Sequence, residues 1–448
     1  MKRKLSLPVA FPICLLSVSL AAQTAMPSYK EVKLKNGLRV LLMEDHSTPV
    51  IAISVVYDVG SRVEKPGHTG FAHLFEHMMF QGSANVGKGE HLQLIQENGG
   101  GMNGTTSEDR TNYFEMLPSN QLDLGLYLEA DRMRSLAITQ ANLDNQRNAV
   151  QEERRLRMDN QPYGKSPEAL RSLMYDNFAY KHSTMGSMAD LNAASVEDVQ
   201  QFFKTYYAPN NAVIALVGDF KTADALKKIE QNFVAIPSQP AAPPLDVTEP
   251  RQQAERRLTI TDDFAKLPLL TVAYKTTRAD TPDYFALDLL LSILCDGESS
   301  RLYQRLVEKD KLAVQLLGGM EPSRGTSMAE IRVVSPQGTD TTKVEAAIYG
   351  EISKLAKDGP EDWEMEKVRN GERKHQVSQT STDLVRAVTM AQDAVFYNDP
   401  TLMYTEVKRY DAVTKDQIRR VAQQYLTENN RSVLITLPKT SPAAQDAR

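Results

Sequence analysis

The chain has 448 residues, of which 41% are hydrophobic and 24% are charged, and its formal net charge is −5. This length exceeds one ordinary hydrophobic core, so we expect two or more domains of a soluble globular protein. Loss of the basic residues 2–4 would make the net charge −8, which argues against nucleic acid as a partner.

The first residues have the three parts of an export signal. Residues 2–4 are basic, an apolar run continues to Leu20, and two alanines follow. This order is typical of a cleaved signal peptide, to which we assign residues 1–25. A membrane anchor is the alternative, but the apolar run is short and contains two prolines. We therefore expect a periplasmic or secreted protein with no membrane segment after cleavage.

Residues 70–80 contain the motif HxxEH as His73, Glu76 and His77, among apolar neighbours. On a helix the two histidines share a face and Glu76 lies at its edge, because each residue turns about 100°. A catalytic zinc takes about three protein ligands and leaves one position for water, so the histidines supply two ligands. Glu76 can act as a general base and acid on that water. The spacing predicts a hydrolytic metal site, although manganese or cobalt could use the same ligands.

Two later segments carry further polar candidates. Residues 99–114 pass from three glycines into threonines and aromatic residues, which predicts a turn and then a strand. Residues 145–158 predict a charged helix with Val150 and Leu156 on its inner face. This helix carries Glu152 and Glu153, which point about 100° apart, so only one of them can join the metal site comfortably.

One order of elements occurs twice. A helix at 195–206, an Asn pair and an apolar strand recur with a helix at 414–425, and the offset along the chain is the same from the helix through the Asn pair. The strand 51–57 is likewise echoed by 269–274, but aliphatic residues replace the metal ligands in the helix that follows. We interpret the repeat as a duplication. Five prolines mark the linker between the copies, and the predicted parts are 26–236 (metal domain), 237–251 (linker), 252–440 (second domain) and 441–448 (tail).

These features resemble the inverzincin peptidases, the family of pitrilysin, insulin-degrading enzyme and mitochondrial processing peptidase. The separation between His77 and Glu153 fits the family's third zinc ligand, and the resemblance nominates Glu153 for that role. The resemblance extends from about Val32 to Pro438. It implies an α+β fold of two homologous domains, each a mostly antiparallel sheet packed with helices, with one zinc ion in the first. It also places Gln146 where the family has a Glu, so a charge behind the ligands is missing.

The resemblance also implies how substrate binds. The strand that matches 99–114 lies at a sheet edge, where a peptide adds as an extra strand and Asn103 lies beside the scissile bond. From the residues alone, Asn103 could equally be a turn residue. The loop 180–186 contains His182, which matches a histidine that often faces substrate. We expect a zinc endopeptidase that acts on peptides or small unfolded proteins.

The second half lacks two groups that single-chain members of the family use. Their Arg and Tyr, which contact substrate, fall on Val307 and Val314, and Arg305 and Tyr303 have the wrong order and spacing. In the two-subunit branch, a homologous partner without HxxEH supplies both groups. We therefore expect this chain to be the zinc-bearing subunit of such a pair, with a homodimer as an alternative. A non-catalytic scaffold or a peptide-binding subunit of the same fold is the alternative function.

Overall fold

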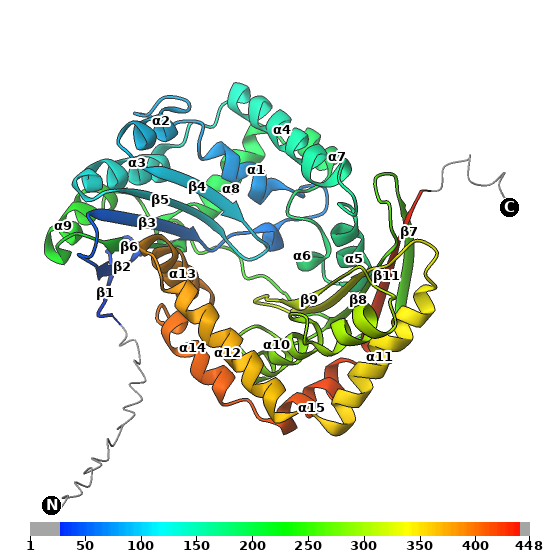
Figure 1. Ribbon diagram of the computed structural model, residues 1–448. Coiled ribbons are helices and arrows are strands. Elements are labelled where there is room, and N and C mark those ends of the chain that lie inside the picture. The colour runs from blue at the N-terminus through cyan, green and yellow to red at the C-terminus, as the bar shows by residue number, and fades with distance from the viewer. Residues whose placement is uncertain (1–26, 440–448) are drawn as a thin grey trace, which may run out of the picture.

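The computed structural model describes residues 27–439, so the predicted signal peptide and tail lie outside the described residues. Two sheets form the centres of two halves (Figure 1). The first sheet has the order β1-β2-β6-β3-β5-β4. Its strands are β1 (Lys30–Lys33), β2 (Arg39–Glu44), β3 (Val50–Tyr57), β4 (Gly101–Thr106), β5 (Thr111–Pro118) and β6 (Ala212–Gly218).

The second sheet has the order β7-β11-β8-β10-β9. Its strands are β7 (Arg256–Asp262), β8 (Leu269–Lys275), β9 (Gln315–Glu321), β10 (Met328–Val334) and β11 (Arg431–Pro438). Neighbouring strands are antiparallel except for one parallel pair in each sheet, β2 with β6 and β7 with β11. The predicted α+β class, with two homologous domains built on mostly antiparallel sheets, is confirmed. The segment between the two sheets, residues 237–255, contains no helix or strand.

Helices cover both sheets. In the first half the principal helices are α1 (Phe71–Met78), α2 (Glu90–Glu97), α3 (Leu122–Ser135), α4 (Gln140–Arg154), η3 (Arg155–Asp159, a π-helix), α5 (Ser166–Met174), α6 (Phe178–Lys181), α7 (Met188–Ala193), α8 (Val196–Tyr206) and α9 (Thr222–Phe233). In the second half they are α10 (Pro282–Cys295), η5 (Tyr303–Lys309), α11 (Thr341–Asp358), α12 (Asp362–Gln379), α13 (Asp383–Phe396), α14 (Leu402–Asp411) and α15 (Lys415–Tyr425). Between residues 27 and 439, no helix has the length and apolar character needed to span a membrane.

The repeated segments fold alike. Helices α8 and α15 are the two helices of the sequence repeat, and both begin with a capping box, at Ser195 and Thr414. In a capping box, the side chains of the first cap and of the third helical residue bind each other's backbone N–H groups, which fixes the start of the helix. Each helix then leads, through the Asn pair, into the buried strand of its own sheet, β6 or β11.

The two halves exchange one helix each. Helix α13 of the second half packs on β3 and β6 of the first sheet, and helix α5 of the first half packs against β7, β8 and β11 of the second (Figure 1). Around α13 the buried apolar residues come from both halves and include Leu41, Val56 and Val217 with Ala387, Met390 and Ala391. Each half thus has a core of its own on one face of its sheet, while a helix of the other half covers the opposite face.

Candidate metal centre

Helix α1, which carries the HxxEH motif, is anchored at its first residues. Gly70 precedes it with a φ of 86°, a left-handed conformation that glycine adopts without strain. The buried carboxylate of Glu64 accepts hydrogen bonds from the N–H groups of Gly70 at 2.9 Å and Ala72 at 2.8 Å. These bonds satisfy free donors of the helix, and a negative charge there is favoured by the helix dipole. Burial nevertheless raises the pKa of Glu64 to about 8.

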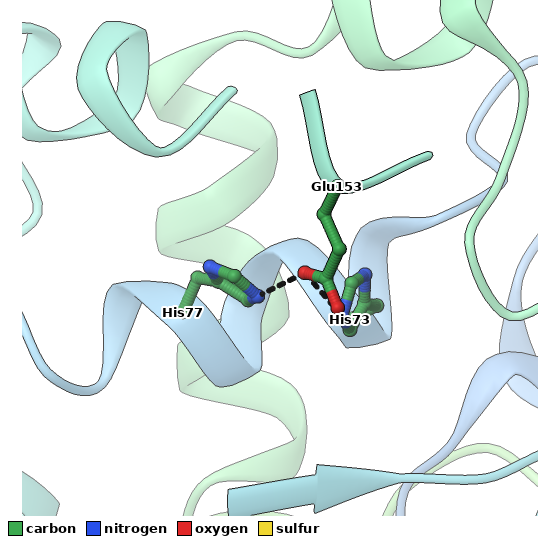
Figure 2. Close-up of side chains that lie close together, drawn as sticks. All are labelled: His73, His77 and Glu153. Carbon is green, nitrogen blue, oxygen red and sulfur yellow. Dashed lines mark ion pairs between the residues drawn. The ribbon is translucent and has the colours of Figure 1, made fainter. Parts of the chain in front are cut away.

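Helix α4 brings Glu153 to the two histidines of α1, as Figure 2 shows. Glu153 Oε2 lies 3.1 Å from His77 Nε2 and 3.5 Å from His73 Nε2. A tetrahedral zinc with bonds of about 2.0–2.1 Å holds two of its ligand atoms about 3.3 Å apart. The two distances from Glu153 to the histidines are close to this spacing, and all three donor atoms lie within 4.8 Å of one another, so the structure brings together all three predicted ligands.

The protonation states of these groups also suit a metal. Burial, and then the nearby His77, lower the pKa of His73 to about 4, so its imidazole is neutral. The hydrogen bond with His77 lowers the pKa of Glu153, so the carboxylate is ionised. Metal binding needs neutral imidazoles and ionised carboxylates. In addition, His73 Nδ1 is buried and has no hydrogen-bond partner among the described residues.

Glu76 is buried on the same helix and is held by strand β4. Thr106 Oγ1 donates a hydrogen bond to Glu76 Oε2 at 2.5 Å. Gly104 lies so close that a Cβ there would be 3.1 Å from Glu76 Oε1. Burial raises the pKa of Glu76, against the lowering effect of the Thr106 hydrogen bond. A carboxylate with a raised pKa beside metal ligands can both accept and return a proton.

Strand β4 is the edge strand of the first sheet. Ser107 N donates to Arg110 O at 2.9 Å, and because bonded and non-bonded pairs alternate in an antiparallel ladder, the backbone groups of Gly104 face the open edge. Asn103 is exposed, and its Oδ1 accepts a hydrogen bond from Gly104 N at 2.9 Å. The side chain of Asn103 thus covers a backbone donor that an added strand would need.

The other two predicted residues lie near the metal group's supporting helices. Gln146 is buried on α4, two turns before Glu153, and its Nε2 donates to Asn145 Oδ1 at 2.7 Å. His182 follows α6, stacks on Phe178, and places its Nδ1 3.4 Å from Glu64 Oε2. His182 is therefore beside the carboxylate that anchors α1, and a contact with substrate stays a prediction.

The supporting residues were not predicted from the sequence, and one apolar residue was misplaced. Glu64, Gly104 and Thr106 were not identified, because their contacts depend on how a loop and β4 pack on α1. A carboxylate shortly before a helix is the one signal that could have indicated Glu64. Leu156, predicted to face inward, is 56% exposed. Six residues turn an α-helix about 120° away from the face of Val150, and the buried face continues instead through Arg154 and Met158.

A second group of possible metal ligands lies under β5 and consists of His91, Glu115 and Glu129. Here a side chain already supplies the positive charge. Arg132 is fully buried, its Nε donates to Glu129 Oε2 at 3.0 Å, and its guanidinium lies 4.5 Å from the ring of Tyr113. A metal ion beside this guanidinium would be repelled, so we interpret the group as a buried polar cluster around Arg132 and not as a metal site. No comparable group occurs in the second half within the described residues.

Two valines of the second half stand where the resemblance places the Arg and the Tyr that contact substrate. Val307 is partly buried against the second core, and Val314 is 55% exposed just before β9. Arg305 forms an ion pair with Asp310 at 2.5 Å, in the π-helix that also contains Tyr303. Val307 and Val314 offer no side-chain hydrogen bond.

Comparisons with known proteins agree with this arrangement. Residues 39–188 match the family model described as insulinase (peptidase family M16), and residues 193–372 match the model described as peptidase M16 inactive domain. The zinc protease PqqE of Helicobacter pylori is 29% identical over 431 residues, covering 94% of this chain and 96% of that protein. The mitochondrial-processing peptidase subunit beta of Lentinula edodes is 24% identical, covering 92% of this chain and 91% of that protein.

Solved structures show the same fold. The crystal structure of a protease from Helicobacter pylori has a TM-score of 0.87 at 27% identity, covering 92% of this chain and 100% of that chain. The periplasmic protease PqqL from Escherichia coli has a TM-score of 0.76 at 20% identity, and the match covers 94% of this chain but 49% of that one.

Two α+β domains of one fold, with an HxxEH group in the first alone, are typical of a class of zinc-dependent peptidases. The chain belongs to peptidase family M16, and the predicted resemblance to the pitrilysin family is confirmed.

Proposed function

We propose that the chain is a zinc-dependent endopeptidase that binds one zinc ion through His73, His77 and Glu153. One observation carries the proposal: the donor atoms of two histidines and a carboxylate lie within 4.8 Å of one another beside Glu76, which is held against an open sheet edge. Relatives named zinc proteases support zinc as the metal. Gln146 would lie behind the ligands and leave the site with one negative charge fewer than a Glu would.

The metal and the residues beside it would have separate roles in the reaction. Zinc held by His73, His77 and Glu153 would act as a Lewis acid, which polarises a carbonyl and makes water a nucleophile near neutral pH. Glu76 accepts the proton of the attacking water and later gives it to the leaving nitrogen. Thr106 keeps Glu76 oriented through its hydrogen bond, and Glu76 itself is buried.

Substrate would bind in extended form along β4. Its backbone would pair with the open edge, so sequence demands would be low and peptides or small unfolded proteins would fit. Asn103 would release Gly104 N–H to the substrate and turn its own amide toward the substrate carbonyl. His182, in its partly enclosed position beside Glu64, is the less favoured substrate residue.

We further propose that a homologous subunit completes the site. Val307 and Val314 leave the second half without donors at the expected positions, and a relative is itself named a subunit. A homodimer is the alternative. Residues 1–25 would direct the chain to the periplasm, in keeping with a fold neighbour described as a periplasmic protease. The domain bounds 26–236 and 252–440, with the linker 237–251, belong to the same proposal.

The decisive experiment compares the purified chain with Glu76→Gln. We expect zinc content near one ion per chain for both. Without its partner the chain should cleave an internally quenched peptide only weakly, and this weak turnover should fall at least about 100-fold further in the variant, because the proton acceptor is lost. Glu152→Gln is the control, since Glu152 is exposed and pairs with Arg155. Unchanged turnover in Glu76→Gln would contradict the proposed base.

The same preparation tests the alternatives. A chain that binds peptide and zinc with no turnover that depends on Glu76 would be a binding subunit or scaffold. Full activity of the pure chain as a homomer would contradict the need for a homologous partner.

A further inference from the structure

The carboxylate of Glu153 has different partners on its two oxygens. Oε2 faces both histidines, whereas Oε1 lies 2.8 Å from Nη1 of Arg157. Glu153 belongs to the last turn of α4, and Arg157 belongs to the π-helix η3 that follows. Arg157 lies four residues after Glu153, the i,i+4 spacing at which side chains on a helix meet.

The bond to Arg157 has a consequence for metal binding. A carboxylate can bind a cation through one oxygen or through both. An oxygen that accepts a charge-assisted hydrogen bond from a guanidinium is a poorer second ligand, because its lone pair is already engaged. Arg157 thus separates the roles of the two oxygens of Glu153.

We propose that Arg157 is a positioning residue that keeps Oε1 of Glu153 away from the metal, so that Glu153 binds through Oε2 alone. This inference rests on the metal site of the proposed function. The pairing of Arg157 with Oε1 would leave one coordination position of the metal open. A second carboxylate oxygen would otherwise compete with water and substrate for the ion.

The neighbouring arginines have other partners, so the role belongs to Arg157 alone among them. Arg155 Nη1 pairs with Glu152 Oε2 at 3.0 Å, away from the ligand group. Arg154 is buried and pairs with Glu168 at 2.8 Å and with the carbonyl of Gly186. Arg154 therefore fixes the end of α4 and with it the point where η3 begins.

The exposure of Arg157 sets the expected size of the effect. Its side chain is 74% exposed, and exposed ion pairs contribute little free energy. We expect zinc affinity to change only about 2- to 5-fold on its removal. The coordination number of the metal should change more clearly than the affinity for zinc. Oε1 belongs to the same carboxylate as the ligand atom Oε2, so it lies close to the ion as soon as Arg157 no longer holds it.

The test uses the full chain loaded with cobalt(II), whose visible absorption weakens when four-coordinate geometry becomes five-coordinate. We expect Arg157→Gln to weaken the absorption and to lower the zinc Kd about 2- to 5-fold in competition with a chelator, because the variant frees a second carboxylate oxygen and removes a nearby positive charge. Arg157→Lys, which can still donate to Oε1, should stay close to the wild type. Arg155→Gln is the matched control, because it removes the same charge two residues away and should change neither readout.

Two results would overturn the inference alone: an Arg157→Gln spectrum identical to the wild type, or equal changes in Arg155→Gln. A wild-type chain that takes up no cobalt or zinc would overturn it together with the proposed metal site. Metal uptake with the expected spectra but no peptide hydrolysis, by the chain alone or with its homologous partner, would support the role of Arg157 and contradict the proposed activity.

Discussion

Gly104 determines how closely strand β4 approaches Glu76. A Cβ at this position would lie 3.1 Å from Glu76 Oε1 and 3.2 Å from Phe80 Cζ, so any other residue would push the carboxylate or the strand. We expect Gly104→Ala to lower kcat about 10-fold or more with little loss of stability, because small displacements of a reacting group are costly. Gly101→Ala is the control in the same strand, since nothing lies within 4 Å of its Cβ. Equal kcat values in the two variants would show that this approach does not matter.

For single residues, the sequence predicts a group of side chains within one helix but not the contacts between separate elements. His73, Glu76 and His77 follow from one helical turn, whose geometry needs no knowledge of the rest of the fold. Glu153 was separable from Glu152 only by resemblance, because both occupy the same kind of surface helix. Thr106 was beyond prediction, since its hydrogen bond depends on where β4 lies relative to α1.

Among the elements, helix α2 and strand β5 are joined by a buried pair that links stability to pH. His91 Nε2 lies 3.3 Å from Glu115 Oε2, and burial, with Arg132 nearby, lowers the pKa of His91 to about 3. An unfolded histidine has a pKa of about 6.5, so between these values the unfolded chain binds more protons and stability falls as the pH falls.

We expect the zinc-free wild type to lose about 2 kcal/mol of unfolding free energy from this histidine between pH 7 and pH 5. His91→Gln removes the titrating group, so urea unfolding of this variant should lack that part of the loss. Comparison of the two chains at both pH values isolates His91 from other groups. Parallel pH dependence of the two chains would contradict a neutral, buried His91.

The elements themselves were largely predictable, with one informative exception. Helices α8 and α15 and the strands after them have clear caps and apolar patterns, and they form where expected. The helix predicted over 145–158 instead ends at Arg154 and continues as a π-helix. Side-chain periodicity in the sequence follows α-helical turns, so a wider turn that depends on tertiary anchors such as Arg154 leaves no pattern to detect.

For the whole molecule, the exchange of α5 and α13 makes the halves dependent on each other. Without α13, the apolar face formed by β2, β3 and β6 would be exposed to water. We expect residues 27–251 expressed alone to aggregate or to unfold without a cooperative transition, as followed by circular dichroism in urea. Co-expression with residues 252–439 should restore a soluble complex. Cooperative unfolding of 27–251 by itself would contradict this dependence.

The duplication could be predicted because a constant offset between 195–206 and 414–425 needs no structure to be seen. The exchange of helices α5 and α13 between the halves could not be predicted from the sequence. The apolar run of β3 indicates a strand buried on both faces, but a pattern of hydrophobic residues does not say which helix provides the cover.

Helix α13 also fixes the order of events during synthesis. Arg386 on this helix pairs with Asp45, 341 residues earlier in the chain, and the helix ends at Phe396. All three predicted ligands are made once Glu153 has been added, yet the sheet beside them gains its second cover only when α13 follows, far later in the chain. Contacts over such separations close slowly. The ligands of the metal site are thus made early, whereas the apolar face of the sheet that α13 covers stays exposed until late in synthesis, and until then it can associate with another exposed sheet.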